Sequence, residues 1–296
     1  MSVLSAEDRA FWDENGYVVV HDAVPLENCR AAEGAVWDFL EMDEDESETW
    51  YPDPPRRGIM VEMYQHQALW NNRQSPRLHQ AFSEIWGDEK LWVSFDRTSM
   101  NPPERHDFEF KGPFLHWDMK LDMPVKLKVQ GVLYLTDTPG NQGAFTCIPG
   151  FHRKLEKWLD DLPEDINPRE VIREEHAHEA RAIEGKAGDL VIWHSALPHG
   201  SSPNSSDQPR MAQYITMSPA REDREDVRED RIRGWQERLT GLGKNDKEKE
   251  HNQGTTAELT PLGRKLLGLD LWNGVSSQGS EKLEEIERKL LGADQA

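Results

Sequence analysis

The sequence predicts a mainly β protein, a sandwich or barrel of short strands with helices at both ends of the chain. Short apolar segments predict the strands, at residues 91–95, 129–135, 143–148, 189–193 and 211–217. Turn-rich segments such as Thr-Pro-Gly-Asn at 138–141 separate them. Because little helical pattern lies between these strands, a sandwich or barrel is favoured over a parallel sheet built from βαβ units.

The N-terminal zone, residues 1–89, predicts helices around one strand. Ser5 and Asp8 have the spacing of a helix capping box, and Gly16 is expected to end that first helix. Residues 17–20, Tyr-Val-Val-Val, then predict a short buried strand.

A second helix is expected over about residues 26–42, opened by Pro25. The acidic stretch at 43–49 predicts a solvated loop. Prolines at 52, 54 and 55 exclude regular structure directly after it.

The predicted strands fall in a core zone of about residues 90–218, which also has one expected helical insert at about 154–162. A charged extension, 219–296, follows. Alternating charges at 221–238 predict a solvated helix, 281–291 predicts a short amphipathic helix, and the polar stretch 243–256 is expected to be mobile. We expect the whole chain, 1–296, to form a single domain.

Composition excludes several classes of protein. The formal net charge of −20 argues against nucleic acid and anionic membranes as partners, because both would repel the surface. Two cysteines, Cys29 and Cys147, are too few for a disulfide framework. The sequence has no apolar run of membrane-spanning length and no secretory pattern at its start, so a cytoplasmic protein that acts on a small molecule is expected. The oligomeric state is left open.

His116 and Asp118 form a His-x-Asp pair within Phe-Leu-His-Trp-Asp, residues 114–118. On a strand, residues two apart project to the same face, so the imidazole and the carboxylate could bind one ion. Trp117 would point the opposite way, into packing. Taken alone, such a pair is more often an ordinary surface pair.

Two histidines follow the apolar segment at 189–193: His194 at its end and His199 in the turn after it. One of them, with the His-x-Asp pair, would place two imidazoles and one carboxylate on one face of a metal ion. That set leaves coordination positions open for a bidentate cosubstrate and O₂, which is the pattern of non-haem iron(II) oxygenases.

Arg210 lies on the next predicted strand, 210 − 199 = 11 positions after His199. A hairpin of that length can bring Arg210 beside the metal. The planar guanidinium makes two parallel charge-assisted bonds to a carboxylate, so it suits a diacid cosubstrate.

These motifs resemble the phytanoyl-CoA dioxygenase family of iron(II)/2-oxoglutarate oxygenases. The resemblance covers about residues 5–217. It includes FWDENGYVVV at 11–20, the His-x-Asp pair, GNQGAFTCIPGFHR at 140–153 and, most specifically, GDLVIWHSALPHGSSPNSSDQPR at 188–210. The expected fold is then a double-stranded β-helix, a cupin-like jelly roll, with flanking N- and C-terminal helices.

By this resemblance the iron(II) ligands are His116, Asp118 and His199. The Gly-Ser after His199 and its spacing to Arg210 fit the family, which favours His199 over His194.

The resemblance also assigns the cosubstrate contacts. Arg210 and Ser201 would hold the distal carboxylate of 2-oxoglutarate, Tyr134 would stand against this cosubstrate, and Asn101 would make a polar contact to it.

The expected activity is hydroxylation of a small organic molecule with release of succinate and CO₂. Two alternatives stay open: a cupin-type metal oxygenase that needs no 2-oxoglutarate, and a non-catalytic sensor that binds iron and 2-oxoglutarate. A halogenase is disfavoured, because Asp118 takes the coordination position that a halide would need.

Other candidate residues receive structural interpretations. His152 is expected to be structural, and His176 and His178 to lie on the surface. Trp50, Trp70 and Trp117 are candidates for lining an apolar substrate cavity.

Overall fold

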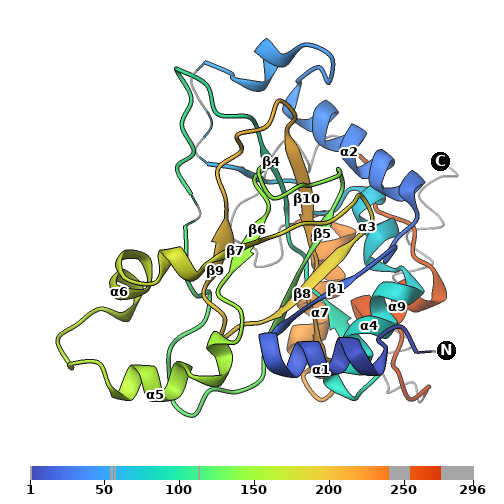
Figure 1. Cartoon of the computed structure of the whole chain (residues 1–296). Helices are drawn as coiled ribbons and strands as arrows, with labels where there is room; N and C mark the ends of the chain where they lie inside the picture. The colour runs from blue at the N-terminus through green and yellow to red at the C-terminus, as the bar shows by residue number, and fades with distance from the viewer. Residues whose placement is uncertain (1, 54–55, 57, 113, 240–253, 275–296) are drawn as a thin grey trace, which may run out of the picture.

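A six-stranded antiparallel sheet forms the centre of the computed structural model, which describes residues 2–53, 56, 58–112, 114–239 and 254–274 (Figure 1). Its strand order is β1-β8-β5-β10-β4-β2. The bounds are β1 (Tyr17–Val20), β8 (Leu190–His194), β5 (Val129–Tyr134), β10 (Arg210–Tyr214), β4 (Thr98–Asn101) and β2 (Met60–Val61).

The remaining strands form two smaller sheets. One has the order β7-β6-β9, with β7 (Arg181–Ile183), β6 (Phe145–Cys147) and β9 (His199–Ser201). The other pairs β11 (Met217–Pro219) with β3 (Leu91–Val93). Side chains from β5, β8 and β10 share one buried cluster with side chains from β6 and β7, so the three-stranded sheet packs against one face of the large sheet.

Helices cover the other face of the large sheet (Figure 1). Buried residues of β5, β8 and β10 pack there against four helices. These are α2 (Leu26–Leu40), α3 (Gln67–Arg73), α4 (Pro76–Trp86) and α9 (Pro261–Leu267). In β8, Leu190 and Ile192 join this helical cluster while Val191 and Trp193 join the cluster between the sheets. Burial on both faces explains why the first four positions of this strand are all apolar rather than alternating.

The N-terminal expectations are confirmed. Helix α1 (Ala6–Asn15) begins at a capping box, in which Ser5 Oγ accepts from the Asp8 amide and the Asp8 carboxylate accepts from the Ser5 amide. Gly16 ends it with φ 75°, a left-handed conformation that glycine adopts without strain. Strand β1 and helix α2 follow as predicted, although α2 ends two residues early and part of the acidic loop forms a 3₁₀ turn, η1 (Ser47–Trp50).

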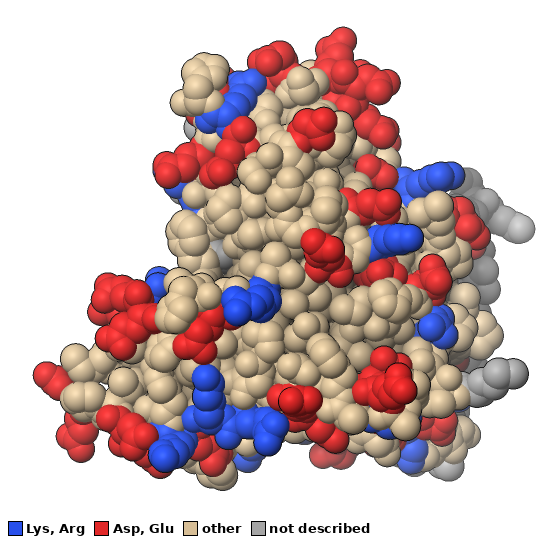
Figure 2. Space-filling model, in the orientation of Figure 1, with Lys and Arg blue, Asp and Glu red and all other residues tan. Residues whose placement is uncertain are grey.

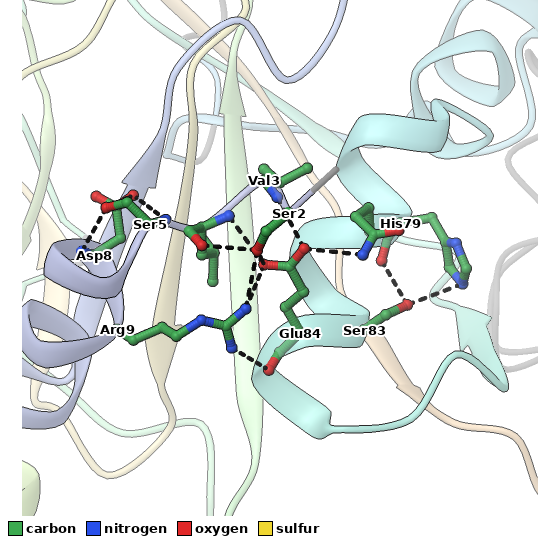
Figure 3. Close-up of polar contacts among 10 residues, drawn as sticks. Ser2, Val3, Ser5, Asp8, Arg9, His79, Ser83 and Glu84 are labelled. Atoms are coloured by element: carbon green, nitrogen blue, oxygen red, sulfur yellow. Dashed lines mark hydrogen bonds and ion pairs between the residues drawn. The ribbon is translucent and has the colours of Figure 1, made fainter.

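Glu84 on α4 ties the start of the chain to the helical layer (Figure 3). Its carboxylate accepts hydrogen bonds from the amides of Val3 and Leu4 and pairs with Arg9 at 2.8 Å. Burial raises the pKa of this carboxyl, but the hydrogen bonds outweigh burial and lower it to about 2.

The sequence patterns did not indicate α3, α4, β2, β4, β7 or β9. Helices α3 and α4 are short, and strand β4, Thr-Ser-Met-Asn, is buried at all four positions although three of them are polar. The expected insert at 154–162 is α5 (Leu155–Asp160), followed by a second helix, α6 (Pro168–Glu174). The strand expected around the His-x-Asp pair is wrong: His116 makes one isolated bridge to His199, and Asp118 lies in a bend.

The C-terminal extension is less solvated than its charges suggest. Helix α7 (Glu225–Gln236) matches the expected helix at 221–238, but Arg228 and Ile232 are buried in it. Arg228 donates to the carbonyls of Gly268 and Leu269, because a buried guanidinium needs acceptors for its N–H groups. The expected helix at 281–291, and most of the stretch 243–256, lie outside the described residues.

The surface in Figure 2 carries many Asp and Glu side chains over α5, α6 and the upper loops, with fewer Lys and Arg. This agrees with the net charge of −20. No helix in the described part of the chain combines the length and the apolar character that crossing a bilayer requires.

Candidate metal centre

Three side chains that are distant in sequence converge on one point. One potential ligand atom from each of His116, Asp118 and His199 lies within 4.8 Å of the others. His116 Nε2 is 3.4 Å from Asp118 Oδ1, and His199 Nε2 is 3.3 Å from Asp118 Oδ2. The two imidazoles therefore face the carboxylate with the same ring nitrogen, as two ligands of one ion would.

Backbone contacts fix the two histidines. The amide of His116 donates to the carbonyl of His199 at 2.9 Å, and the amide of His199 donates back at 3.0 Å. Each Nδ1 lies beside a carbonyl two residues earlier: Phe114 O at 2.7 Å for His116, and Leu197 O at 3.0 Å for His199. When Nδ1–H donates to that carbonyl, Nε2 is left as the unprotonated metal-binding nitrogen.

The electrostatics favour positive charge between the three groups. Hydrogen bonds from His116 and His199 hold the pKa of the Asp118 carboxyl far below its ordinary value, against the effect of burial. Burial lowers the pKa of His116, but its bond to Asp118 outweighs burial, and the net pKa is raised. The site thus contains a carboxylate that stays ionised and two nitrogen donors directed at it.

Arg210 is a buried cation in the same pocket. Only 1% of its surface is exposed. It donates to Gly143 O at 2.8 Å, to Ser99 Oγ at 2.6 Å and to Ser201 Oγ at 2.8 Å. Among the described residues no carboxylate lies within ion-pair distance of it, so its charge is uncompensated by the protein. A buried guanidinium in this state is suited to an anionic ligand.

A pocket of about 690 Å³, including its open mouth, joins the three-residue cluster to Arg210. Its walls are Met60, Asp96, Arg97, His116, Asp118, Gln130, Val132, Tyr134, Phe145, Trp193, His199, Gly200, Ser201, Arg210 and Tyr214. Six of the seven expected site residues, all except Asn101, line this pocket, and the hairpin and the two sheets bring these sequence-distant positions together.

Tyr134 lines the pocket, whereas Asn101 does not. Tyr134 lines the pocket with its ring, while its hydroxyl donates to Ile183 O at 2.6 Å and accepts from the Phe145 amide at 3.0 Å. Burial raises the pKa of Tyr134, so it stays neutral. Asn101 is not among the pocket walls. Its side chain donates to Ser202 O, behind the strand pair that positions Arg210.

Gln130 and Asp96 are wall residues that the sequence patterns did not indicate. Gln130 Nε2 donates to Asp118 Oδ2 at 2.8 Å, on the carboxylate that faces the histidines. Its signal in the sequence is a single amide within the apolar strand Val-Gln-Gly-Val-Leu-Tyr. Asp96 and Arg97 form a second polar wall, in which Arg97 pairs with Glu62 at 3.1 Å.

The remaining histidines lie outside the cluster. His194 Nδ1 accepts from the Ala196 amide at 3.0 Å, and its ring lies 5.4 Å from that of His152. Burial, with a smaller contribution from His152, lowers the pKa of His194 to about 4. His178 is exposed, as expected, but His176 is half-buried and pairs with Glu179.

The tryptophans expected to line the cavity do not do so. Trp50, Trp70 and Trp117 are buried in the two apolar clusters, and none of them lines this pocket. Trp193 takes that place instead. The expected inward packing of Trp117 is confirmed, with its indole N–H donating to Ala196 O at 2.8 Å.

A family model described as phytanoyl-CoA dioxygenase matches residues 12–212, more than half of the chain. The chain belongs to the phytanoyl-CoA dioxygenase family. The match spans all the strands from β1 to β9 and most of β10, and with them the three converging side chains and Arg210.

Individual proteins are similar to this chain over most of its length. A protein from Dictyostelium discoideum whose name places it in this family is 25% identical over 259 residues, covering 71% of this chain and 74% of its own. An ectoine dioxygenase from Sphingopyxis alaskensis is 24% identical over 231 residues, covering 72% and 75%. The solved structure of the epimerase SnoN, in complex with Fe³⁺, alpha ketoglutarate and nogalamycin RO, is similar in fold, with TM-score 0.53, 17% identity and coverage of 72% and 83%.

Proposed function

We propose that this protein is an iron(II)- and 2-oxoglutarate-dependent dioxygenase that hydroxylates a small organic molecule, with release of succinate and CO₂. One observation carries the proposal. A pocket that holds two histidines and a carboxylate, all facing one point, also holds a buried arginine with no anionic partner among the described residues. Membership of the family supports it, and so does the solved relative with iron and alpha ketoglutarate.

His116, Asp118 and His199 would hold the iron. Two neutral imidazoles and one carboxylate are the donor set of non-haem iron oxygenases, and they leave positions open for other ligands. Both Nε2 atoms and both carboxylate oxygens are already directed at one point, so little side-chain reorganisation is needed.

Arg210 and Ser201 would bind the distal carboxylate of 2-oxoglutarate. The guanidinium is held in place by the Gly143 carbonyl and two serine hydroxyls, which position it without neutralising its charge. The Tyr134 ring would form the wall against the carbon chain of the cosubstrate. Because its hydroxyl is bonded to the backbone on both sides, Tyr134 acts through shape rather than as an acid.

Iron(II) with 2-oxoglutarate, when bound, would supply the chemistry, an oxidation by O₂ coupled to loss of CO₂. This chain contributes position and a partly enclosed site. Gln130 orients the Asp118 carboxylate, and the rings of Phe145 and Trp193 pack against the buried imidazole of His199. The substrate would enter beside Asp96, Arg97 and other polar walls.

We further propose that residues 1–296 form one oxygenase domain with a double-stranded β-helix core. The large sheet and the three-stranded sheet would be its two faces. Packing of the helical layer against the large sheet, with α9 in the same apolar cluster as α2, supports one continuous unit.

Titration of 2-oxoglutarate into the anaerobic iron(II) protein, followed by the visible charge-transfer band, tests the proposal. Arg210→Met should weaken 2-oxoglutarate binding, because loss of one partner of a buried charge pair costs about 2–5 kcal/mol, or roughly 30-fold to several-thousand-fold in affinity. Arg210→Lys keeps the charge but loses the fork, so an intermediate loss is expected.

Arg233→Met is the matched control, because Arg233 is exposed on α7, pairs with a surface aspartate and is not among the pocket walls. It should leave 2-oxoglutarate affinity unchanged. Absence of the band in the unaltered protein would favour an oxygenase that needs no 2-oxoglutarate. Binding without succinate formation across a broad substrate library would favour the sensor.

A further inference from the structure

The segment that carries His116 and Asp118 lacks a strand on its outer side. Backbone bonds join His116 to His199, so this segment extends the edge of the β7-β6-β9 sheet by one isolated bridge. Along an extended chain, successive carbonyls point to opposite sides. With the carbonyl of His116 directed at β9, those of Leu115 and Trp117 point away from the sheet, where a further strand would normally pair with them.

Two arginines of α6 occupy that side. Arg173 Nε donates to Leu115 O at 2.8 Å. The guanidinium of Arg169 donates to Trp117 O through one nitrogen and to Met119 O, at 2.8 Å, through another. Every second carbonyl from Leu115 to Met119 is therefore bonded by a side chain from one helix.

The spacing of the two arginines along α6 matches the spacing of alternate carbonyls along the extended segment. Residues four apart on a helix lie one above another, about 6 Å apart along the axis. Alternate residues of an extended chain are about 6.6 Å apart. Arg169 and Arg173, four apart, can thus reach carbonyls two residues apart, and the planar fork of Arg169 spans a third.

No ion pair within the described residues competes for these two guanidinium groups. Among the described residues, neither Arg169 nor Arg173 has a carboxylate within ion-pair distance, although the chain is strongly acidic. Helix α6 itself is anchored: Asn167 caps it by accepting from the Arg169 amide at 3.0 Å, and Ile172 is fully buried.

The chain between β6 and β7, which includes α5 and α6, also packs against Trp117, the residue between the two proposed ligands. Trp117 packs at ring-centroid distances of 6.0 Å from Phe151 and 6.1 Å from Trp158, which belongs to α5. In Figure 1 the segment with α5 and α6 projects from the sheets on the side where the chain approaches β9. The insert between β6 and β7 therefore contacts the ligand segment through its backbone and through its central side chain.

We propose that α6 is a clamp for the metal centre, in which Arg169 and Arg173 are positioning residues that set His116 and Asp118 through the alternate carbonyls of their segment. The inference rests on the proposed iron site. Removing the clamp leaves the ligands present but free to move, so metal affinity falls while the rest of the fold persists.

The test measures Mn(II) binding to the metal-free full-length protein, through the electron paramagnetic resonance signal of free Mn(II). Arg169→Ala/Arg173→Ala should weaken Mn(II) binding about ten- to a hundred-fold, the usual effect of removing a group that orients metal ligands. Each single variant should lose less. Arg169→Lys and Arg173→Lys should recover part of the loss, because one ammonium can bond one carbonyl.

The sign of the effect separates positioning from charge. Both arginines are cations close to the ligand segment, so their removal would by electrostatics alone strengthen binding of a divalent cation. Weaker binding therefore reports lost geometry. Arg181→Ala is the matched control: Arg181 follows α6 as the first residue of β7 and donates to carbonyls of the turn before it, and its loss should leave Mn(II) affinity unchanged.

Thermal unfolding of the metal-free variants distinguishes a clamp from a general structural role. A lower unfolding midpoint with unchanged Mn(II) affinity in the single variants would overturn the clamp. His199→Ala measures how much Mn(II) affinity is lost when a ligand is removed. If the unaltered protein bound Mn(II) and His199→Ala did not, unchanged affinity in the arginine variants would reject the clamp alone. If the unaltered protein bound neither Mn(II) nor Fe(II), the iron site itself would be rejected.

Discussion

The two halves of the candidate metal centre are built differently. His199 and Ser201 lie on β9 and Arg210 begins β10, so regular strand pairing sets their positions. His116 and Asp118 lie on a segment with one isolated bridge, and side chains from α6 and β5 hold it instead.

This difference shows two ways to reach the same precision. In the strand half, β9 and β10 pair with neighbouring strands over several residues, and ligand geometry follows from the sheet register. In the segment half, arginine and glutamine side chains replace the missing strand. Because long side chains lose rotamer freedom when they are fixed, the segment half should be easier to perturb by single substitutions away from the ligands.

Loss of a ligand from the strand half should have the largest effect. His199→Ala removes one of the proposed iron-binding nitrogens, so turnover should vanish and Fe(II) binding should fall by at least a hundred-fold, an order of magnitude set by the strength of structural metal–ligand bonds. The fold should survive, since the strands remain paired. His194→Ala is the control, and near-normal activity of His199→Ala with loss in His194→Ala would reverse the assignment.

A smaller effect is expected where the halves meet. Gln130 lies on β5 but bonds to Asp118 of the segment half, so Gln130→Leu should lower Mn(II) affinity by about tenfold without changing 2-oxoglutarate binding through Arg210. Gln80→Leu, at an exposed position of α4, serves as the control. Equal affinity in the Gln130 variant would mean that the segment holds Asp118 without help from the sheet.

The smallest effect on the site should come from Glu84, far from both halves. Its folded pKa, about 2, lies below the ordinary value of 4.5, so its stabilising contribution is present above about pH 4.5 and is lost as pH falls through about 2. Glu84→Gln should lower the free energy of unfolding by about 1–2 kcal/mol at pH 7. Urea denaturation at pH 7 and near pH 3 measures this, and the gap should narrow at the lower pH.

Metal affinity of Glu84→Gln at pH 7 should equal that of the unaltered protein. If Glu84→Gln lost both stability and metal affinity, the site would be sensitive to global stability. Effects of substitutions on metal affinity could then not be assigned to the strand half or the segment half.

Local patterns predicted the elements whose side chains follow one periodicity. The capping box at Ser5, the glycine at Gly16 and the apolar runs of β5 and β8 depend on neighbours in sequence, and all are observed. The patterns failed for β4, because its polar residues are buried by partners far along the chain: Ser99 bonds to Arg210, and Asn101 to Ser202.

The sequence by itself determined which residue types could bind a metal and a diacid, since the His-x-Asp pair, His199 and Arg210 have a recognisable spacing. Tertiary structure decided how they meet. No local rule places Arg169 and Arg173 against the carbonyls beside His116, or Gln130 against Asp118, because these contacts join residues 12 to 58 positions apart. Spacing to Arg210 favoured His199 over His194 only through the family resemblance. The tertiary structure gives the physical reason: the turn between β8 and β9 directs His199 to the carboxylate and leaves His194 beside His152.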